Sequence, residues 1–297
     1  MKNVTIAVTQ MSCTSDREHN INNAANLVRK AAAKGAQVVV LQELFETPYF
    51  CIDKDKKYMA EALAVEANPA IKAMQKLARE LNVVIPISFY ELAGPRYFNS
   101  LAMIDADGVL LGIYRKSHIP DFPRYEEAFY FEQGDTGFMI FDTKYGRIGG
   151  AVCWDQWFPE AARIMALKGA EIIVYPTAIG VDLAFPDYHS RQHWQQTMQG
   201  HAAANMVVVA ASNRVGLEHG ETGSINFYGG SFIADQFGTL VGEAGEEDGE
   251  IVINSFDLDA IREVRRRWGI YRTRRTDLYD SVKQSASQDL LDDRAVS

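Results

Sequence analysis

The chain has 297 residues, of which 47% are hydrophobic and 23% charged, and its formal net charge is -9. These proportions are ordinary for a soluble globular protein and give ample length for a core. The acidic balance argues against nucleic-acid binding, which needs clustered lysine and arginine, and fits a neutral or cationic small substrate. The one basic block, residues 262–275, is interpreted as a solvated or subunit-contacting helix face followed by a tail.

Membrane and disulfide patterns are both missing from the sequence. The first ten residues lead directly into a strand pattern, and no apolar run is long enough to cross a membrane. The three cysteines, Cys13, Cys51 and Cys153, form no paired framework. We therefore expect a reducing compartment, the cytosol, with no membrane partner.

Hydrophobic periodicity predicts alternating strands and helices in the first half of the chain. In order, these are a strand over 4–9, a helix capped by Ser15-Asp16 and stopped by Gly35, a strand over 38–42, a helix over 68–81, a strand over 83–89, and a hairpin of strands over 99–104 and 109–115. The apolar strand 38–42 ends at Glu43, and the hairpin ends at Lys116. In open α/β sheets, sites form at the carboxyl ends of strands.

The second half begins with a long loop, residues 117–137, which contains Glu126 and Glu127. A loop of that length in a compact domain is usually functional or disordered. The elements predicted after it are paired strands over 138–141 and 147–152, a helix from Pro159 to about Ala170, a strand over 172–175, a helix over 190–205, a strand over 207–211, antiparallel strands over 228–234 and 251–256 with a turn at 236–238, and a closing helix over 257–268.

An internal similarity relates the two halves. Residues 34–40 resemble residues 168–174, and each stretch follows a predicted helix. With βα units and hairpins in both halves, this pattern predicts two similar halves that pack sheet on sheet with helices outside. No linker interrupts the chain, so we expect a single domain over residues 1–297.

Cys153 stands where the apolar strand 147–152 ends and a helical pattern begins. Pro159 suits the first turn of that helix. A thiol at such a junction would face free backbone N–H groups and the positive end of the helix dipole, which favour the thiolate. The arrangement parallels the strained strand-to-helix turn that exposes a hydrolase nucleophile. The alternative is a buried structural cysteine, which most free cysteines are.

Glu43, Lys116 and Cys153 each follow an apolar run, and together they supply a base, a fixed positive charge and a nucleophile. Those are the groups that acyl transfer requires. Taken singly, a charge at a strand end is an ordinary solvated boundary residue. Three stretches resemble, in the expected order, the catalytic segments of the nitrilase superfamily of carbon-nitrogen hydrolases: Leu41-Gln42-Glu43, Tyr114-Arg115-Lys116 and Gly150-Ala151-Val152-Cys153-Trp154-Asp155.

That resemblance implies a four-layer α-β-β-α sandwich, catalysis by Glu43, Lys116 and Cys153 without a metal or other cofactor, and a homodimer or larger homo-oligomer. It also implies that Glu127 is a fourth catalytic residue, which orients the lysine or the substrate nitrogen. Glu126 is the neighbouring alternative. We expect a C-terminal extension, from about residue 269, to take part in subunit contacts.

Within the superfamily, the sequence is most similar to the N-carbamoylputrescine amidohydrolases. The matching stretches are 118–121, 130–131, 134–138, 153–160, 175–180, 198–202, 211–214 and 268–272. This similarity implies a small cationic ureido substrate, N-carbamoylputrescine, which is hydrolysed to putrescine, carbon dioxide and ammonia through a carbamoyl thioester. Another amidase, carbamoylase or nitrilase activity is the alternative. The stretch Phe122-Pro123-Arg124 departs from the glycine-containing segment expected there.

The substrate tail is predicted from the residues that follow the nucleophile. Related carbamoylases of amino acids place an arginine there, whereas this chain has Trp154-Asp155-Gln156-Trp157. A substrate carboxylate would find no guanidinium fork there, while an amine tail could use carboxylates and aromatic faces. The candidate substrate-binding residues are Tyr49, Trp154, Phe185 and Asp187.

Two other classes of function compete with this hypothesis. His189 and His193 are one helical turn apart and His201 follows, which permits a metal hydrolase, although no glutamate beside His189 completes the usual zinc motif. A non-catalytic binding protein on the same fold is the second. Cys13 and Cys51 are interpreted as structural, with Cys51 near the pocket because it follows Glu43.

Overall fold

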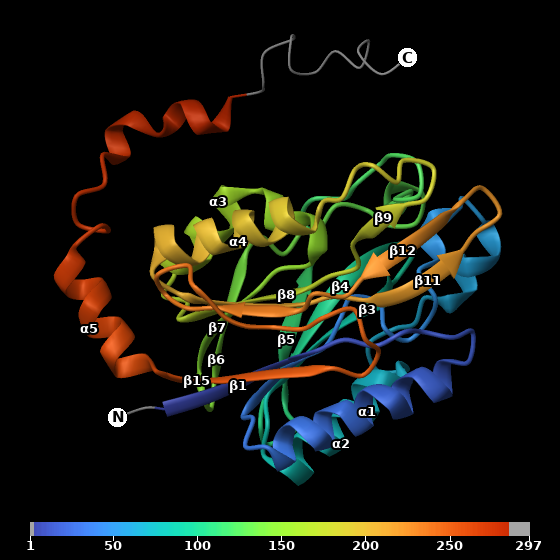
Figure 1. Cartoon of the computed structure of the whole chain (residues 1–297), viewed down its shortest axis with the longest axis horizontal. Coiled ribbons are helices and arrows are strands. Elements are labelled where there is room, and N and C mark those ends of the chain that lie inside the picture. Colours follow the sequence, from blue (N-terminus) through green and yellow to red (C-terminus); the bar gives the residue numbers. More distant parts are fainter. Residues whose placement is uncertain (1–2, 285–297) are drawn as a thin grey trace. The chain divides into compact units, whose positions relative to one another are not determined.

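The computed structural model describes residues 3–284, and the chain divides into two compact units, Met1–Arg262 and Glu263–Ser297. In the first unit the helices follow in the predicted order, and paired helices lie on both outer faces of facing sheets (Figure 1). The helices are α1 (Arg17–Ala33), α2 (Pro69–Leu81), α3 (Pro159–Leu167), α4 (Arg191–Asn205) and α5 (Leu258–Trp268), the last of which runs into the second unit.

Helix ends follow local chemistry that the sequence predicts. The Asp16 side chain accepts a hydrogen bond from the backbone N–H of His19, and the Asn68 side chain accepts one from Ile71. Such side chains satisfy N–H groups that have no partner within the helix. Pro159 begins α3 and Pro69 begins α2, as their fixed φ allows. Within residues 3–284, no helix is long and apolar enough to cross a membrane.

The two sheets that carry the site have matching strand orders. One runs β15-β1-β2 and continues through the parallel bridge Val38–Val84 into β3-β4-β5, and the other runs β14-β13-β10-β8-β7-β6. Their bounds are β1 (Asn3–Thr9), β2 (Val38–Val40), β3 (Ile85–Ala93), β4 (Arg96–Ile104), β5 (Leu110–Arg115), β6 (Met139–Thr143), β7 (Gly146–Gly150), β8 (Ile172–Pro176), β10 (Val208–Ser212), β13 (Phe232–Ala234), β14 (Leu240–Glu243) and β15 (Ile251–Asp257). This matched order confirms the four-layer sandwich of two similar halves.

A third, smaller sheet has the order β11-β12-β9, with β9 (Gly180–Asp182), β11 (Val215–His219) and β12 (Ser224–Tyr228). The sequence does not predict it, because β9 is short and β11 lies in a polar stretch. The predicted strand 228–234 is wrong as one element. Gly229 and Gly230 both have positive φ, which favours glycine, and they divide it into β12 and β13 in different sheets.

The predicted pairing of strand 251–256 is also wrong. The turn at 236–238 joins β13 to β14, whereas β15 pairs antiparallel with β1, with Thr9 opposite Ile251. The first strand and the last strand of the first unit therefore close one sheet together. Hydrophobic patterning cannot select between partners so far apart in sequence.

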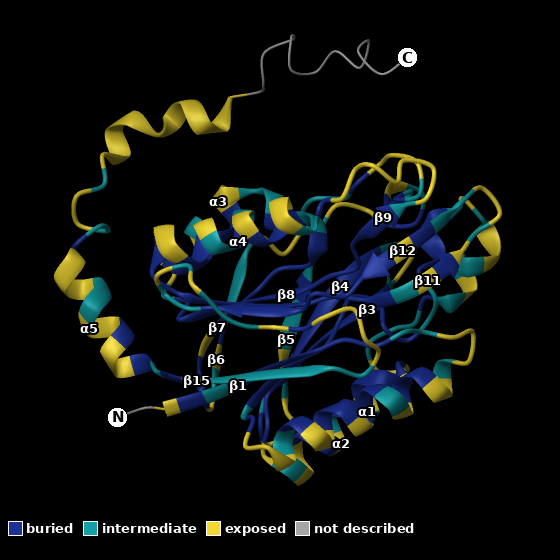
Figure 2. Cartoon of the chain, in the orientation of Figure 1, coloured by how far each residue is buried: buried dark blue, intermediate teal, exposed yellow. Residues whose placement is uncertain are grey.

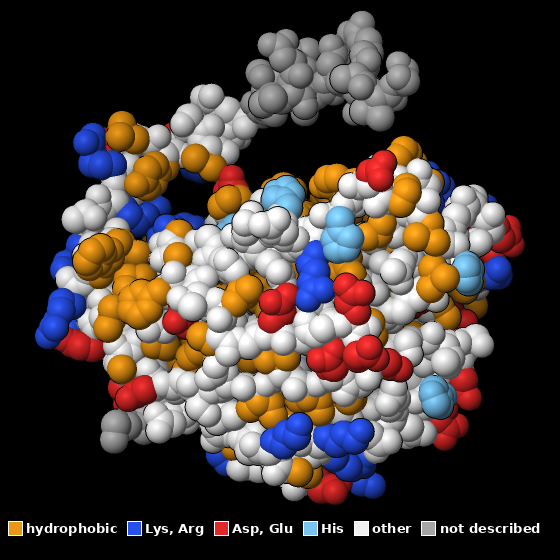
Figure 3. Space-filling view, in the orientation of Figure 1, with side chains coloured by type: hydrophobic (Ala, Val, Ile, Leu, Met, Phe, Trp, Pro, Cys, Tyr) orange, Lys and Arg blue, Asp and Glu red, His pale blue; other side chains and the backbone are white. Residues whose placement is uncertain are grey.

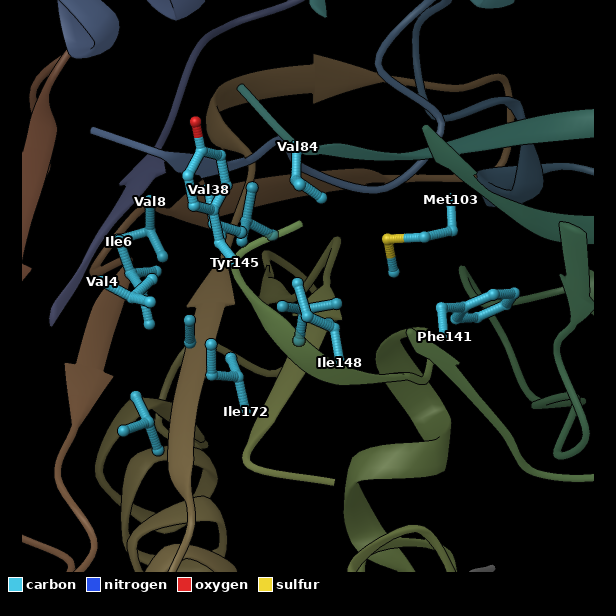
Figure 4. Close-up of a cluster of buried hydrophobic side chains, with 14 of the residues drawn as sticks. Val4, Ile6, Val8, Val38, Val84, Met103, Phe141, Tyr145, Ile148 and Ile172 are labelled. Atoms are coloured by element: carbon cyan, nitrogen blue, oxygen red, sulfur yellow. The ribbon is translucent and has the colours of Figure 1, made fainter. Parts of the chain in front are cut away.

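The core between the sheets follows from strand alternation. Val4, Ile6 and Val8 of β1 point into the layer shown in Figure 4, together with Ile148 of β7 and Ile172 of β8. Ala7, on the opposite side of β1, packs in the other apolar cluster, which contains the buried faces of α1 and α2. Figure 2 shows the result: the central strands are buried, β15 is mostly intermediate, and exposed positions lie on the outer sides of the helices and in the loops. On the face in Figure 3, basic side chains lie beside acidic ones.

Candidate active site

Glu43, Lys116 and Cys153 converge at the strand ends of the two facing sheets. Lys116 directly follows β5, while Glu43 and Cys153 lie three residues beyond β2 and β7. All three are buried, with Cys153 3% exposed and the two charged residues fully enclosed. Because the strands are packed in the core, their ends hold these side chains in fixed positions.

The lysine connects two carboxylates. Lys116 Nζ lies 2.9 Å from Glu43 Oε1 and 2.6 Å from Glu127 Oε2. The Tyr49 hydroxyl donates to Glu127 Oε1 at 2.8 Å, and Asn99 Nδ2 donates to Glu43 Oε1 at 2.7 Å. Among the described residues, Glu43 Oε2 is the buried oxygen of this group without a hydrogen-bond partner. That oxygen is free to accept a proton.

These contacts decide the charges in the cluster. Burial would lower the pKa of Lys116, but the carboxylates of Glu127 and Glu43 outweigh it and hold that pKa above its usual value. Burial raises the pKa of Glu127 to about 7, opposed by Lys116 and assisted by Glu43. A buried ammonium between two carboxylates therefore keeps its proton, since the charged form has close partners of opposite sign.

Cys153 has the strained backbone that the sequence predicts and a different electrostatic setting. Its φ is +40°, a left-handed conformation that is unfavourable for a side chain with a Cβ, and its Sγ lies 3.8 Å from the carbonyl oxygen of Ala178. A 3-10 turn, Cys153–Trp157, follows at once, so α3 begins only at Pro159. The expectation that a helix N-terminus favours the thiolate is therefore wrong. Burial, then Glu43, raise the pKa of Cys153 well above its usual value, and Lys116 opposes them.

Arg214 holds the backbone that carries Glu43. Its guanidinium is fully buried, donates to the carbonyl oxygens of Glu43 and Leu44, and pairs with Glu218 at 2.7 Å. Leu44 itself has a φ of +47°. The sequence contains no local signal for this role, because Arg214 comes from the segment between β10 and β11, far along the chain. Fixed donors on both carbonyls oppose relaxation of the strained backbone.

The four predicted substrate-binding residues have different settings. Tyr49 is buried and bonded to Glu127, and the half-buried Trp154 follows the nucleophile directly. Phe185 is 62% exposed, and Asp187 is also exposed in the loop between β9 and α4. The structure therefore joins Tyr49 to the charged cluster, places Trp154 beside Cys153, and leaves Phe185 and Asp187 as solvent-exposed loop residues.

The turn that departs from the expected glycine segment packs near the nucleophile. The Phe122 ring lies 5.2 Å from the ring of Trp154. Arg124 has a φ of +67°, where glycine is favoured, and its Nε lies 2.7 Å from Asp182 Oδ2. Gly223 leaves room for this arginine, because a Cβ there would lie 2.8 Å from Arg124 Cδ.

The three histidines considered for a metal site have separate partners. The His189 ring lies 5.2 Å from that of Tyr228, and the His193 ring lies 4.7 Å from that of Trp157. His201 Nε2 is 2.8 Å from the backbone oxygen of Gln156. In the part of the chain that the structure describes, no group of three or more His, Cys, Asp or Glu side chains could hold a metal ion.

Comparisons with known proteins show which proteins this chain resembles. The family model described as carbon-nitrogen hydrolase matches residues 5–266. The chain is 53% identical over 281 residues to an N-carbamoylputrescine amidase from Solanum tuberosum, covering 93% of each protein. It is 45% identical over 282 residues to a citrullinase from Francisella tularensis, covering 95% of this chain and 99% of the relative.

A similar solved structure is the carbon-nitrogen hydrolase from Helicobacter pylori. It superposes with a TM-score of 0.90 at 38% identity, covering 96% of this chain and all of that one. Nit3 of Saccharomyces cerevisiae, described as a member of the nitrilase superfamily, gives a TM-score of 0.77 at 27% identity, with 92% and 97% coverage.

Proposed function

Because the chain belongs to the carbon-nitrogen hydrolase family, and is therefore a hydrolase, we propose that its substrate is N-carbamoylputrescine. The products are putrescine, carbon dioxide and ammonia, which places the enzyme in polyamine biosynthesis. The observation that carries this proposal is the similarity, over nearly the whole chain, to relatives named N-carbamoylputrescine amidase. The buried group of Glu43, Lys116 and Cys153 supports the chemistry.

In the first half-reaction, Cys153 Sγ attacks the ureido carbon while Glu43 Oε2 takes the thiol proton. This base is needed because the buried thiol keeps its proton at neutral pH. Lys116 and the backbone N–H of Trp154 stabilise the oxyanion, and one such donor is worth about 3 kcal/mol. Glu43 then gives the proton to the departing nitrogen, so ammonia leaves and a carbamoyl thioester remains on sulfur.

In the second half-reaction, Glu43 takes a proton from water, whose oxygen attacks the thioester carbon. The carbon–sulfur bond breaks, the proton returns to Cys153, and the released carbamate decomposes to carbon dioxide and putrescine. Glu127 accepts from Tyr49 and pairs with Lys116, so we assign it the role of holding the ammonium toward the oxyanion.

Citrulline is the second candidate substrate, favoured by the citrullinase relative. Both molecules present a ureido group, and citrulline adds a carboxylate beside its ammonium. Arg124 stands two residues after Phe122, whose ring lies beside that of Trp154, and this cation could meet the carboxylate, whereas its partner Asp182 could meet an ammonium. The absence of an arginine from residues 154–157 does not decide between the two substrates, because Gln156 in this stretch is fully buried and its side chain accepts a hydrogen bond from Trp194.

Ammonia release by the purified protein tests the proposal. The substrates are N-carbamoylputrescine, citrulline, an N-carbamoyl α-amino acid, a simple amide and a nitrile. We expect the highest kcat/KM with N-carbamoylputrescine. Preference for citrulline would keep the chemistry and reject the substrate, and preference for the amide or nitrile would reject the ureido class.

The cellular compartment and the oligomeric state are inferred from features outside the active site. Three free thiols suit a reducing compartment, so we place the protein in the cytosol. In the second unit, Trp268 is 75% exposed and Leu278 60% exposed. Large apolar side chains so exposed suit a contact surface, and we assign the extension from about residue 269 to contacts in a homodimer or larger assembly. Residues 285–297 of this extension lie outside the described residues.

A further inference from the structure

Asp155 is a fully buried carboxylate that accepts four hydrogen bonds. Its Oδ2 accepts from the backbone N–H of Val152 at 3.1 Å and from the Tyr114 hydroxyl at 2.7 Å. Its Oδ1 accepts from the backbone N–H of His118 at 3.0 Å and lies 2.7 Å from His118 Nδ1. Both oxygens are therefore fully used, with two donors each.

The donors to Asp155 come from the segment around the lysine and from the segment around the nucleophile. Tyr114 and His118 stand two residues before and two residues after Lys116. Val152 directly precedes Cys153, and Asp155 is two residues beyond it. The Asp155 carboxylate thus connects the segment that carries Lys116, through the Tyr114 hydroxyl and the His118 backbone N–H and ring, to the segment that carries Cys153, through the Val152 backbone N–H, across the two facing sheets.

The donors themselves have little freedom to move. The His118 ring stacks on Phe158 with centroids 3.6 Å apart and an interplanar angle of 5°, and Phe158 immediately precedes α3. Tyr114 is fully buried, and burial followed by Asp155 raises the pKa of its hydroxyl well above the usual value, so it remains a donor. Hydrogen bonds to an ionised, buried acceptor are stronger than neutral ones.

We infer that Asp155 is a positioning residue that fixes the separation between Cys153 and Lys116, and so aligns the attacking sulfur with the oxyanion site. This inference rests on the proposed catalytic roles of those two residues. An amide cannot replace the carboxylate, because asparagine has one acceptor oxygen and would turn an N–H group toward two of the four donors. A small misplacement of reacting groups is enough to slow a reaction strongly.

The first test is Asp155→Asn, measured with whichever substrate the wild type hydrolyses. We expect kcat to fall about 100-fold with KM within about twofold of wild type, because a positioning change acts on the transition state more than on binding. Unchanged kcat in the folded variant overturns the inference, as does a raised KM with unchanged kcat. The matched control is Glu171→Gln, another buried carboxylate that accepts a backbone N–H, from Arg147 at 3.0 Å. We expect it to leave kcat within about twofold.

Two variants of His118, one of the donors to Asp155, keep the test valid even if Asp155→Asn fails to fold. His118→Leu removes one donor, and we expect kcat to fall about tenfold. His118→Asn places a side-chain N–H near the former Nδ1 and should restore most of that loss. Equal kcat for the two variants would overturn the inference, since a purely structural role of the ring would not distinguish a donor from a methyl group.

A substrate-independent readout separates this inference from the proposed function. Iodoacetamide labelling of Cys153 at a series of pH values, followed by peptide mass spectrometry, measures how the reactivity of this thiol depends on pH. The thiol interacts with Glu43, Lys116 and Glu127. Burial and Glu43 raise the pKa of Cys153 and Lys116 opposes them, so we expect the inflection to move to higher pH in Asp155→Asn and to stay in place in Glu171→Gln. An unmoved inflection in Asp155→Asn would overturn the inference, whether or not the wild type hydrolyses any of the substrates. A wild type that hydrolyses none of them would reject the proposed function alone.

Discussion

The same strands supply two kinds of buried region, one apolar and one charged. Val38 and Val40 of β2 belong to the apolar layer between the sheets, and Glu43 follows three residues later. Ile148 of β7 lies in that layer, and Cys153 follows the strand. Both regions exclude water almost completely, yet they are stabilised by opposite means.

In the apolar layer, burial itself is favourable, at roughly 25 cal/mol per Å² of apolar surface, and depends little on direction. In the charged cluster, burial is unfavourable and must be offset by close partners. Each carboxylate or ammonium there is held by at least one ion pair or hydrogen bond of defined geometry. A change in the first region should therefore cost stability alone, while a change in the second should alter chemistry, pH response or both.

Replacing the nucleophile should give the largest effect. We expect Cys153→Ser to lower kcat at least about 10,000-fold, because loss of a nucleophile removes the covalent route, while the free energy of unfolding changes by no more than about 2 kcal/mol. Ammonia release and thermal unfolding measure the two quantities. Activity above a tenth of the wild-type value would reject the proposed mechanism.

Truncation in the apolar layer should give the opposite result. Ile148→Ala removes buried methyl and methylene groups five residues before Cys153, and we expect a loss of about 2–5 kcal/mol in the free energy of unfolding. The kcat of the folded enzyme should stay within about twofold, and Ile148→Val, costing about 0.5–1.5 kcal/mol, is the graded control. Urea unfolding and single-temperature kinetics check both. A large fall in kcat with little loss of stability would contradict the division between the regions.

The Glu127→Gln variant should distinguish the charged cluster from the apolar layer by the pH dependence of the free energy of unfolding. Burial raises the pKa of Glu127 to about 7, from an ordinary value of 4.5, so the native state holds this proton more tightly than the unfolded chain. The resulting stabilisation is complete below about pH 4.5 and is lost as the pH rises through 7. Glutamine does not titrate. From pH 5 to pH 8, the wild type should therefore lose stability relative to Glu127→Gln, by at most about 3 kcal/mol.

Denaturant unfolding of both proteins at several pH values measures this difference, with Ile148→Val as the control that should follow the wild type at every pH. A constant difference between wild type and Glu127→Gln would mean that the carboxyl group keeps its ordinary pKa despite its burial.

Sequence reasoning succeeds for features that are local. The caps of α1 and α2, and the positions of Glu43, Lys116 and Cys153 after apolar runs, all follow from patterns of a few residues. The family resemblance added the four-layer order and pointed to Glu127, because its motifs preserve spacing across the long loop.

The features that sequence reasoning missed depend on distant partners. The pairing of β15 with β1 joins the two ends of the first unit, and the pattern of either strand fits several neighbours. Asp155 and Arg214 lie in stretches that resemble the family, but the sequence predicts no role for either, because their hydrogen-bond partners come from other segments. The raised pKa of Cys153 also follows from tertiary burial, which a strand-to-helix pattern does not reveal.

The smallest effect is expected at Arg124, which belongs to neither region. Arg124→Gly relieves a positive φ but loses the pair with Asp182 and gains freedom in the unfolded chain. These contributions oppose one another, so we expect the free energy of unfolding to change by less than about 1 kcal/mol. Removing this cation and freeing the Asp182 carboxylate should lower KM for N-carbamoylputrescine about threefold relative to KM for citrulline, leaving kcat unchanged.

Arg124→Asn is the matched control, because asparagine tolerates the left-handed conformation, lacks the charge and adds less flexibility than glycine. If charge is the cause, both variants should change the ratio of the two KM values equally. A changed ratio in the glycine variant alone would assign the effect to turn flexibility. An unchanged ratio in both would show that the turn at residues 122–125 contacts Trp154 without influencing the substrate tail, and would limit specificity to the enclosed charged cluster.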